Sequence, residues 1–171
     1  MERPGVEPWL RGTLTEVDPV LRAVLHALEL AREDAGRWAD DLSDAEVHVR
    51  PAGLPSVAFH LRHMVRSLDR LLTYAEGRQL DEAQLAALKT EMDDAVTAEQ
   101  VRTEFAAGLA QAEERVRAFS PVQFAEARGV GRKQLPTTVA GLLVHCADHT
   151  QRHSGQMVTT AKVVLAGRAG N

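Results

Sequence analysis

Apolar residues recur at the spacing of an α-helix over four long segments of this chain. In the first of these segments, residues 18–42, successive apolar positions are mostly three or four residues apart, beginning with Leu21, Val24, Leu25 and Leu28. This spacing places the apolar side chains on one stripe of a helix and leaves the opposite face polar. Because such a helix must bury its stripe against other elements, the sequence predicts a bundle of helices.

Each of the four segments begins with a residue that can cap the N-terminus of a helix. The side-chain oxygen of such a residue accepts a hydrogen bond from a backbone N–H group in the first turn. In chain order the candidate caps are Asp18, Ser56, Thr97, and either Thr137 or Thr138. The sequence therefore predicts long helices that run from these caps to about residues 42, 77, 119 and 166, respectively.

The connections between these helices are longer than a minimal bundle requires. Residues 81–93 are expected to form a short helix, whereas residues 122–135, which contain glycines and several charges, are expected to be mostly loop. No segment has a convincing strand pattern. We therefore expect residues 1–171 to form a single all-α domain, a four-helix bundle with long connections whose core covers about residues 18–166.

The charge and hydropathy of the chain argue against two classes of partner. Its 20 Lys and Arg residues and 24 Asp and Glu residues give a formal net charge of −4, and the basic residues are interleaved with acids. Nucleic-acid binding favours a clustered basic face, so we expect no nucleic-acid partner. No apolar run approaches the roughly 18 residues that a membrane span needs, so we expect no membrane association.

The single cysteine, Cys146, indicates a reducing compartment, because it cannot form an intramolecular disulfide. The first residues, MERPGVEPWLRG, carry acids and prolines and lack the apolar centre of a secretion signal, so we expect a cytoplasmic protein. Cys146 follows His145, but adjacent residues on a helix point about 100° apart. A Cys–His nucleophile is therefore not expected.

Five of the seven histidines fall in two of the predicted helices. In the last helix, His145, His149 and His153 follow one another at intervals of four residues, which turns the side chain by only about 40° per step. Neighbouring members of such a row can bind one metal ion together, as in helical H-x-x-x-H zinc sites. Since His145 and His153 lie about 12 Å apart along the axis, two of the three are expected to be ligands.

A third ligand must come from another helix, and the second predicted helix carries His60 and His63. These two side chains point about 60° apart, so only one of them needs to face the site. A single histidine on an apolar face is more often a core residue than a ligand. The convergence of histidines from two helices favours a metal site, while the spacing alone leaves purely structural histidines as an open alternative.

Several other residues near these segments have competing interpretations. Asp148 can accept a hydrogen bond from a histidine ring nitrogen, or it can be a solvated acid on the helix surface, which is the commoner case. Gly155 is expected to allow a neighbouring helix to approach closely. His26 and His48 are isolated in the sequence and are expected near the surface.

Two stretches of the sequence resemble a known family. The stretch HTQRHSGQM at 149–157 resembles the H-x-x-x-H-R-G-Q motif that closes the last bundle helix in the DinB/YfiT-like superfamily. The stretch SVAFHLRHMVRSLDRLL at 56–72 is similar to the second helix of that family, where a histidine follows a run of mostly apolar residues. The resemblance covers residues 18–166 in helix count, long connections and the order of the histidine segments, and it implies a DinB/YfiT-like four-helix bundle.

The resemblance also implies a set of metal ligands. The three-histidine site of the family corresponds to His63, His149 and His153 in this sequence. His63 is preferred to His60 because of its place in the second-helix stretch, and His60 and His145 are expected to border the site. Ser154 stands where the family commonly has arginine, and this departure leaves the substrate open.

Members of this superfamily include metal-dependent hydrolases and transferases that use a low-molecular-weight thiol such as bacillithiol or mycothiol. By resemblance we expect one divalent ion, which can be zinc, nickel, manganese or iron, and thiol S-transfer to a small molecule or its hydrolysis. The alternative is a non-catalytic metal-binding protein of a stress or DNA-damage response. We expect a small-molecule substrate and a homodimer, and the sequence assigns no catalytic residue beyond the metal ligands.

Overall fold

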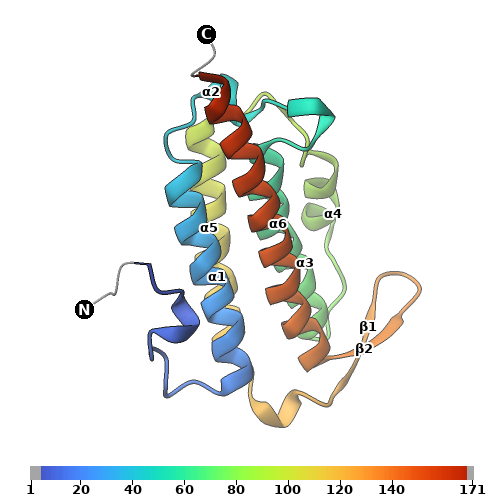
Figure 1. Cartoon of the computed structure of the whole chain (residues 1–171). Coiled ribbons are helices and arrows are strands. Elements are labelled where there is room, and N and C mark those ends of the chain that lie inside the picture. Colours follow the sequence, from blue (N-terminus) through green and yellow to red (C-terminus); the bar gives the residue numbers. More distant parts are fainter. Residues whose placement is uncertain (1–4, 169–171) are drawn as a thin grey trace.

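A computed structural model describes residues 5–168, and four long helices dominate it (Figure 1). Their bounds are Pro19–Trp38 for α1, Val57–Ala75 for α3, Ala98–Arg117 for α5 and Val139–Arg168 for α6. Helix α1 packs against α5 and α6, and α3 packs against the same two helices. The four helices thus form a closed bundle, which confirms the predicted all-α fold.

The expected caps begin all four of these helices. Asp18 Oδ1 accepts a hydrogen bond from the backbone N–H group of Val20 at the start of α1. Ser56 Oγ accepts a hydrogen bond from the backbone N–H group of Phe59 at the start of α3. Thr97 and Gln100 form a reciprocal capping box at the start of α5. At the start of α6, Thr138 Oγ1 accepts from the N–H group of Gly141. These local bonds satisfy N–H groups that have no partner within the helix.

Shorter helices lie in the connections. They are η1 (Pro8–Leu10), α2 (Asp44–Val47), η2 (Pro51–Gly53), α4 (Glu82–Lys89) and η3 (Pro121–Gln123). Helix α4 lies inside the segment predicted to be a short helix. The predicted end of α1 near residue 42 is wrong by four residues, because the chain turns after Trp38 and starts α2 with a new capping box at Ser43.

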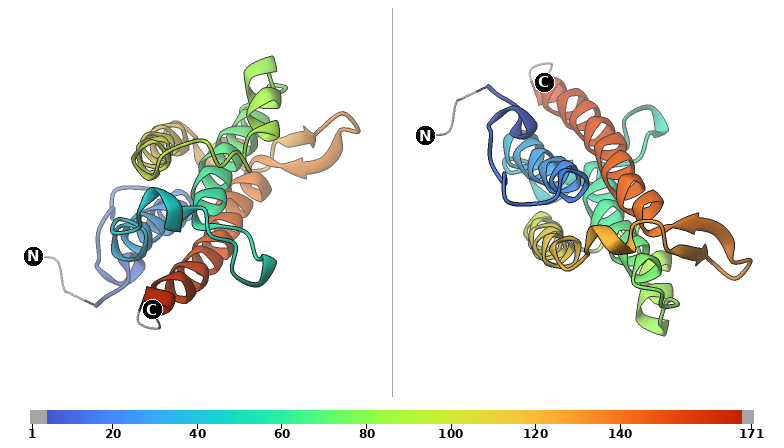
Figure 2. Two further views of the ribbon diagram at one scale, coloured as in Figure 1. Left: turned by 90° about the horizontal axis from the view of Figure 1, so that it is seen from above. Right: turned by 90° about the horizontal axis from the view of Figure 1, so that it is seen from below.

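The prediction of loop over residues 122–135 is partly wrong, because the segment contains most of a β-hairpin. Strand β1 (Ala127–Val130) pairs antiparallel with β2 (Leu135–Thr138), and the hairpin projects from the side of the bundle (Figure 2). Arg128 Nε donates to the carbonyl oxygen of Ala75, which ties the hairpin to the end of α3. Both strands are largely accessible, so no alternation of apolar and polar residues marked them.

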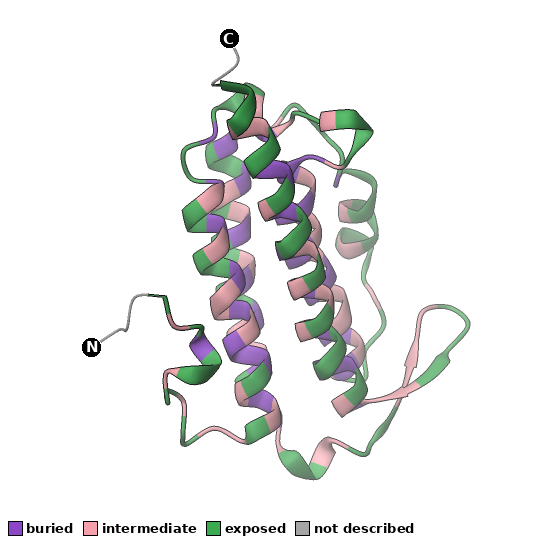
Figure 3. Cartoon of the chain, in the orientation of Figure 1, coloured by how far each residue is buried: buried purple, intermediate pink, exposed green. Residues whose placement is uncertain are grey.

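The core lies along the facing sides of the four long helices (Figure 3). Its largest fully buried side chains are leucines and methionines, among them Leu28, Leu61, Leu109, Leu143 and Met157. Burying a side chain of this size contributes roughly 1.5–3 kcal/mol. None of the helices in the described residues is both long enough and apolar enough to cross a membrane.

Glycine permits one close helix contact in this core. A Cβ atom on Gly108 of α5 would lie 2.5 Å from Val65 Cβ on α3, closer than real side-chain atoms approach. Gly155 of α6 is different, because a Cβ atom placed there would meet no other atom within 4 Å. The expectation that Gly155 serves a close helix approach is therefore wrong.

Candidate metal centre

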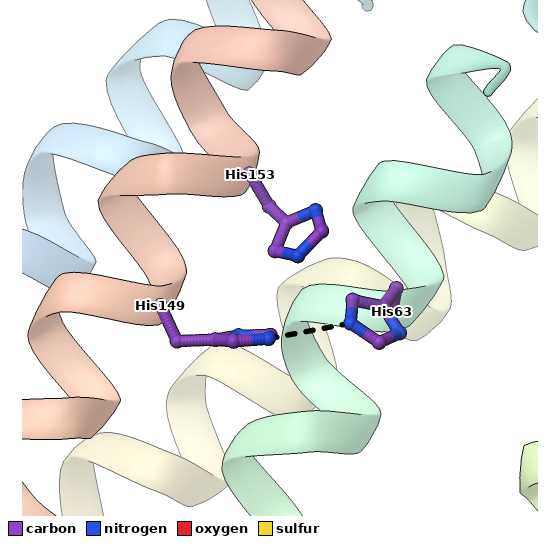
Figure 4. Close-up of side chains that lie close together, drawn as sticks. All are labelled: His63, His149 and His153. Atoms are coloured by element: carbon purple, nitrogen blue, oxygen red, sulfur yellow. Dashed lines mark hydrogen bonds between the residues drawn. The ribbon is translucent and has the colours of Figure 1, made fainter. Parts of the chain in front are cut away.

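Helices α3 and α6 bring three histidines together. His63 of α3 and His149 and His153 of α6 each offer a ring nitrogen, and the three nitrogens lie within 4.8 Å of one another. The ring of His153 lies 4.5 Å, centroid to centroid, from each of the other two rings. In Figure 4 the three rings point toward a common space between the two helices. We call these three residues the histidine triad.

The register of α6 explains why two of its histidines reach this space. His149 and His153 are one turn apart and lie on the side of the helix that faces α3, while Cys146, Thr150 and Ser154 are fully buried. His145 continues the same row but is exposed, and its Nδ1 atom lies 3.7 Å from Asp148 Oδ2. His145 therefore lies outside the triad, in agreement with the limit set by the helix rise, and borders it through a ring contact with His149 at 5.6 Å between centroids.

His63 is held by a carboxylate that the sequence analysis did not identify. Its Nδ1 atom donates to Glu91 Oε2 over 2.7 Å, and the other oxygen of Glu91 accepts from Arg70 over 2.9 Å. Glu91 is buried in the connection between α4 and α5. Nothing in the local spacing distinguishes this acid from the solvated acids around it. Arg70 of α3 is the second partner that holds Glu91.

These contacts fix the proton on the His63 ring. A carboxylate only accepts hydrogen bonds, so Nδ1 carries the proton and the neutral ring keeps its lone pair on Nε2. Burial alone would raise the pKa of Glu91, but hydrogen bonds from His63 and Arg70 bring that pKa below its ordinary value. Glu91 is therefore ionised at neutral pH and acts as an acceptor for the ring.

The distance between two triad nitrogens fits a shared metal ion. His63 Nε2 and His149 Nε2 lie 3.3 Å apart. Two nitrogens that each bind one zinc ion at 2.0–2.1 Å in a tetrahedral arrangement lie roughly 3.3 Å apart. Nδ1 of His149 is buried without a hydrogen-bond partner among the described residues. The donor atoms therefore fit a divalent ion.

Burial keeps the α6 histidines in the form that binds metals. Burial, together with the neighbouring rings of His153 and His63, lowers the pKa of His149 to about 4. Burial, His63 and Arg152 likewise lower the pKa of His153 to about 4. Both rings are neutral at pH 7, as ligands must be. The three triad side chains are nevertheless only half-buried, so the site is open to small molecules.

His60 contacts one member of the triad, His153. It is buried, and its Nδ1 atom lies 3.1 Å from His153 Nδ1, so that one of these two nitrogens donates to the other. Burial lowers the pKa of His60 to about 4. His60 and His63 are thus both in contact with the α6 histidines, although only His63 belongs to the group that could share one ion.

Other residues singled out in the sequence take structural positions. Asp148 accepts from Arg152 over 2.8 Å on the helix surface, which supports its interpretation as a solvated acid. Cys146 is fully buried, and burial raises the pKa of its thiol to about 12. Ser154 is buried and donates to Asp34 of α1 over 2.9 Å, so this position links two helices.

The expectation that His26 and His48 lie near the surface is wrong for His26. It is only 6% exposed, and its Nε2 atom lies 3.1 Å from Thr13 Oγ1. The N-terminal segment around η1 packs over α1, and the periodicity of α1 alone gives no sign of that cover. His48 is half-buried and donates to the carbonyl oxygen of Val96.

Comparison with known proteins places this arrangement in a family. The chain is similar to a conserved protein from Enterococcus faecalis of known crystal structure, with a TM-score of 0.68, 22% sequence identity, and coverage of 88% of this chain and 99% of that one. This likeness supports the fold alone. The curated proteins include no match. The family model of the DinB superfamily matches residues 27–157, which hold all three triad histidines. The chain therefore belongs to the DinB superfamily.

Proposed function

We propose that this protein is a divalent-metal-dependent enzyme that transfers a low-molecular-weight thiol to a small molecule or hydrolyses such a molecule. The observation that carries the proposal is the histidine triad, which joins two helices and includes no carboxylate. Three imidazole ligands leave a fourth position open, as is typical of catalytic rather than structural zinc sites. Zinc, nickel, manganese and iron all accept histidine ligands, so the donor set is compatible with each.

The roles of the protein groups follow from their contacts. His63, His149 and His153 would hold the ion, which would lower the pKa of a coordinated thiol or water and so supply a nucleophile near neutral pH. Glu91 fixes the ring of His63, and both of its oxygens are engaged by His63 and Arg70. These two hydrogen bonds lower the pKa of Glu91 and so make it a weak acceptor for a substrate proton.

The carboxylates near the triad favour thiol transfer over hydrolysis. Among the described residues close to the site, Glu91 is held by His63 and Arg70, and Asp148 lies on the exposed surface of α6, outside the triad. The triad therefore has no carboxylate positioned beside it as a general base. A free thiol has a pKa of about 8.5, far below that of water at about 15.7, so a thiol needs less assistance to ionise.

The proposal is tested by turnover assays on metal-reloaded protein. We expect chelator-sensitive conjugation of small electrophiles with bacillithiol, mycothiol or glutathione as donor, and weaker activity on a parallel panel of esters and amides. The His149→Ala, His153→Ala double variant is the control for metal dependence. If metal-loaded protein shows no chelator-sensitive turnover on either panel, a non-catalytic metal-binding role in a stress response becomes the better account.

A further inference from the structure

A recess beside the triad has the features of a small-molecule site. It has a volume of about 380 Å³ and lies where the start of α3 meets the second half of α6. Its lining includes Leu54, Pro55, His60, Arg152, Gly155 and Thr159, and we call it the Gly155 recess. Small-molecule sites range over roughly 300–1,000 Å³, so this one suits a small ligand.

The lining combines an apolar surface with one cationic group. Leu54 is 48% exposed and forms one wall of the recess together with Pro55. The Arg152 side chain is 56% exposed and donates to Asp148, whose side chain is equally accessible. Exposed pairs of this kind contribute little, so the guanidinium group is free to pair with a carboxylate on a ligand.

The Gly155 recess reaches the triad through one side chain. His60 lines the recess, and its Nδ1 atom lies 3.1 Å from His153 Nδ1. A molecule in the recess is therefore separated from the triad by a single imidazole ring. Gly155 has no side chain that would fill the recess. The space beside it is empty, since an added Cβ atom would meet nothing within 4 Å.

A second recess of about 280 Å³ lies at the opposite end of the histidine row. His145 and His149 line it, together with Ser67, Tyr74 and Leu88. These two recesses, one at each end of the histidine row, leave room for two molecules at once. Such an arrangement suits a reaction between two substrates better than the attack of water on one.

We propose that the Gly155 recess binds the molecule acted on, and that this molecule is small, with an apolar body and a carboxylate that pairs with Arg152. This inference rests on the proposed function for the role of the bound molecule, whereas the binding itself depends only on the recess. The lining contains none of the three triad histidines. Binding should therefore persist in chelated, metal-free protein.

The test uses 4-phenylbutyrate and its neutral amide as probes, measured by ligand-observed NMR titration of metal-free and metal-loaded protein. Gly155→Leu should weaken binding of the carboxylate at least about tenfold, because the new side chain fills open space in the recess. Gly167→Leu is the matched control, since Gly167 also lies in α6 with nothing within 4 Å of an added Cβ atom. It should leave the affinity unchanged.

Arg152→Gln gives a second, independent readout. It should weaken the carboxylate about tenfold while leaving the amide within about twofold, because only the carboxylate gains a charge-assisted bond. Absence of binding to wild-type protein, or equal affinity in wild type and Gly155→Leu at unchanged melting temperature, would overturn the proposal. Binding without any metal-dependent turnover would instead support the recess and count against the proposed enzyme function.

Discussion

The two helices that form the candidate metal centre hold their histidines in different ways. On α3, His63 donates to Glu91, and Glu91 is in turn fixed by Arg70. On α6, the Nδ1 atom of His149 is buried with no partner in the part of the chain that the structure describes. His63 on α3 is therefore positioned by Glu91 from a connection, whereas His149 on α6 is positioned by its helix and by the neighbouring rings.

This difference has an energetic meaning. An unpaired polar atom in the interior costs roughly 1–3 kcal/mol, whereas a charge-assisted hydrogen bond contributes roughly 1.5–3 kcal/mol. The ring of His63 thus has its orientation fixed before any ligand arrives, and the ring of His149 depends on its helix and on its neighbours. The comparison predicts that metal binding through His63 is sensitive to substitution of residues far away in the sequence, such as Glu91. Metal binding through the α6 histidines should be sensitive mainly to substitution of the histidines themselves.

The largest expected effect separates His63 from His60 on α3. His63→Ala should weaken divalent-metal binding by more than about 100-fold, since it removes a ligand and not merely an outer partner. His60→Ala should retain most of the affinity, because His60 contacts the triad only through His153. Isothermal titration with zinc measures both. If His60→Ala abolishes binding and His63→Ala does not, the ligand on α3 has been assigned one turn away from its true position.

A somewhat smaller effect is expected from the residue that fixes His63. Glu91→Gln should lower metal affinity by about 10–100-fold, because loss of an outer carboxylate partner typically has this size. The matched control is Glu104→Gln, whose carboxylate pairs with Arg62 and Arg66 and contacts no histidine. Cobalt titration followed by visible absorption reports both the affinity and the ligand geometry. Equal losses of metal affinity in the two variants would show that metal binding depends on ion pairing in general and does not depend on the orientation of His63.

The helical part of the fold could be predicted from the sequence because its cause is local. Regular apolar spacing and capping residues such as Ser56 and Thr97 depend on neighbours within a few positions, and they predicted all four long-helix starts correctly. The hairpin at 127–138 has accessible strands stabilised by backbone pairing and by Arg128 on Ala75. Such pairing leaves no apolar period in the sequence, so residues 122–135 were interpreted as loop.

The candidate site shows the same division between local and distant causes. The i, i+4 spacing of His149 and His153 is a property of one helix, and it indicated their shared face directly. Glu91 lies 28 residues after His63 in a polar connection, and only the packing of that connection against α3 brings the two together. The choice between His60 and His63 needed a family resemblance, because both lie on the side of α3 that meets α6.

The smallest expected effect on metal binding concerns the inner face of α6. Cys146→Ala should change metal affinity by less than about twofold, because Cys146 is buried and does not belong to the group of side chains that could share one ion. Burial raises the pKa of the thiol to about 12, so the neutral form persists near pH 8 and iodoacetamide should react slowly with the native protein. Mass spectrometry of alkylated protein measures this rate. Fast alkylation of the native state at pH 8 would contradict the burial of this thiol.

The raised pKa of the Cys146 thiol determines the direction in which stability changes with pH. The unfolded thiol ionises near its ordinary pKa of about 8.5, whereas the folded thiol keeps its proton until about pH 12. The unfolded state therefore loses a proton that the folded state retains, and the contribution of Cys146 to stability falls as the pH rises above about 8.5. Alkaline unfolding of wild type and Cys146→Ala, followed by circular dichroism, should show a shallower loss of stability in the variant.

The central claim is that His63, His149 and His153 together hold one divalent ion, and elemental analysis after mild purification and metal reloading tests it most directly. We predict about one ion per chain in the wild-type protein and less than about a tenth of that in the His149→Ala, His153→Ala double variant. Circular dichroism of both proteins establishes that the bundle remains folded. Wild-type protein without stoichiometric metal, or a folded double variant with unchanged metal content, would contradict the claim.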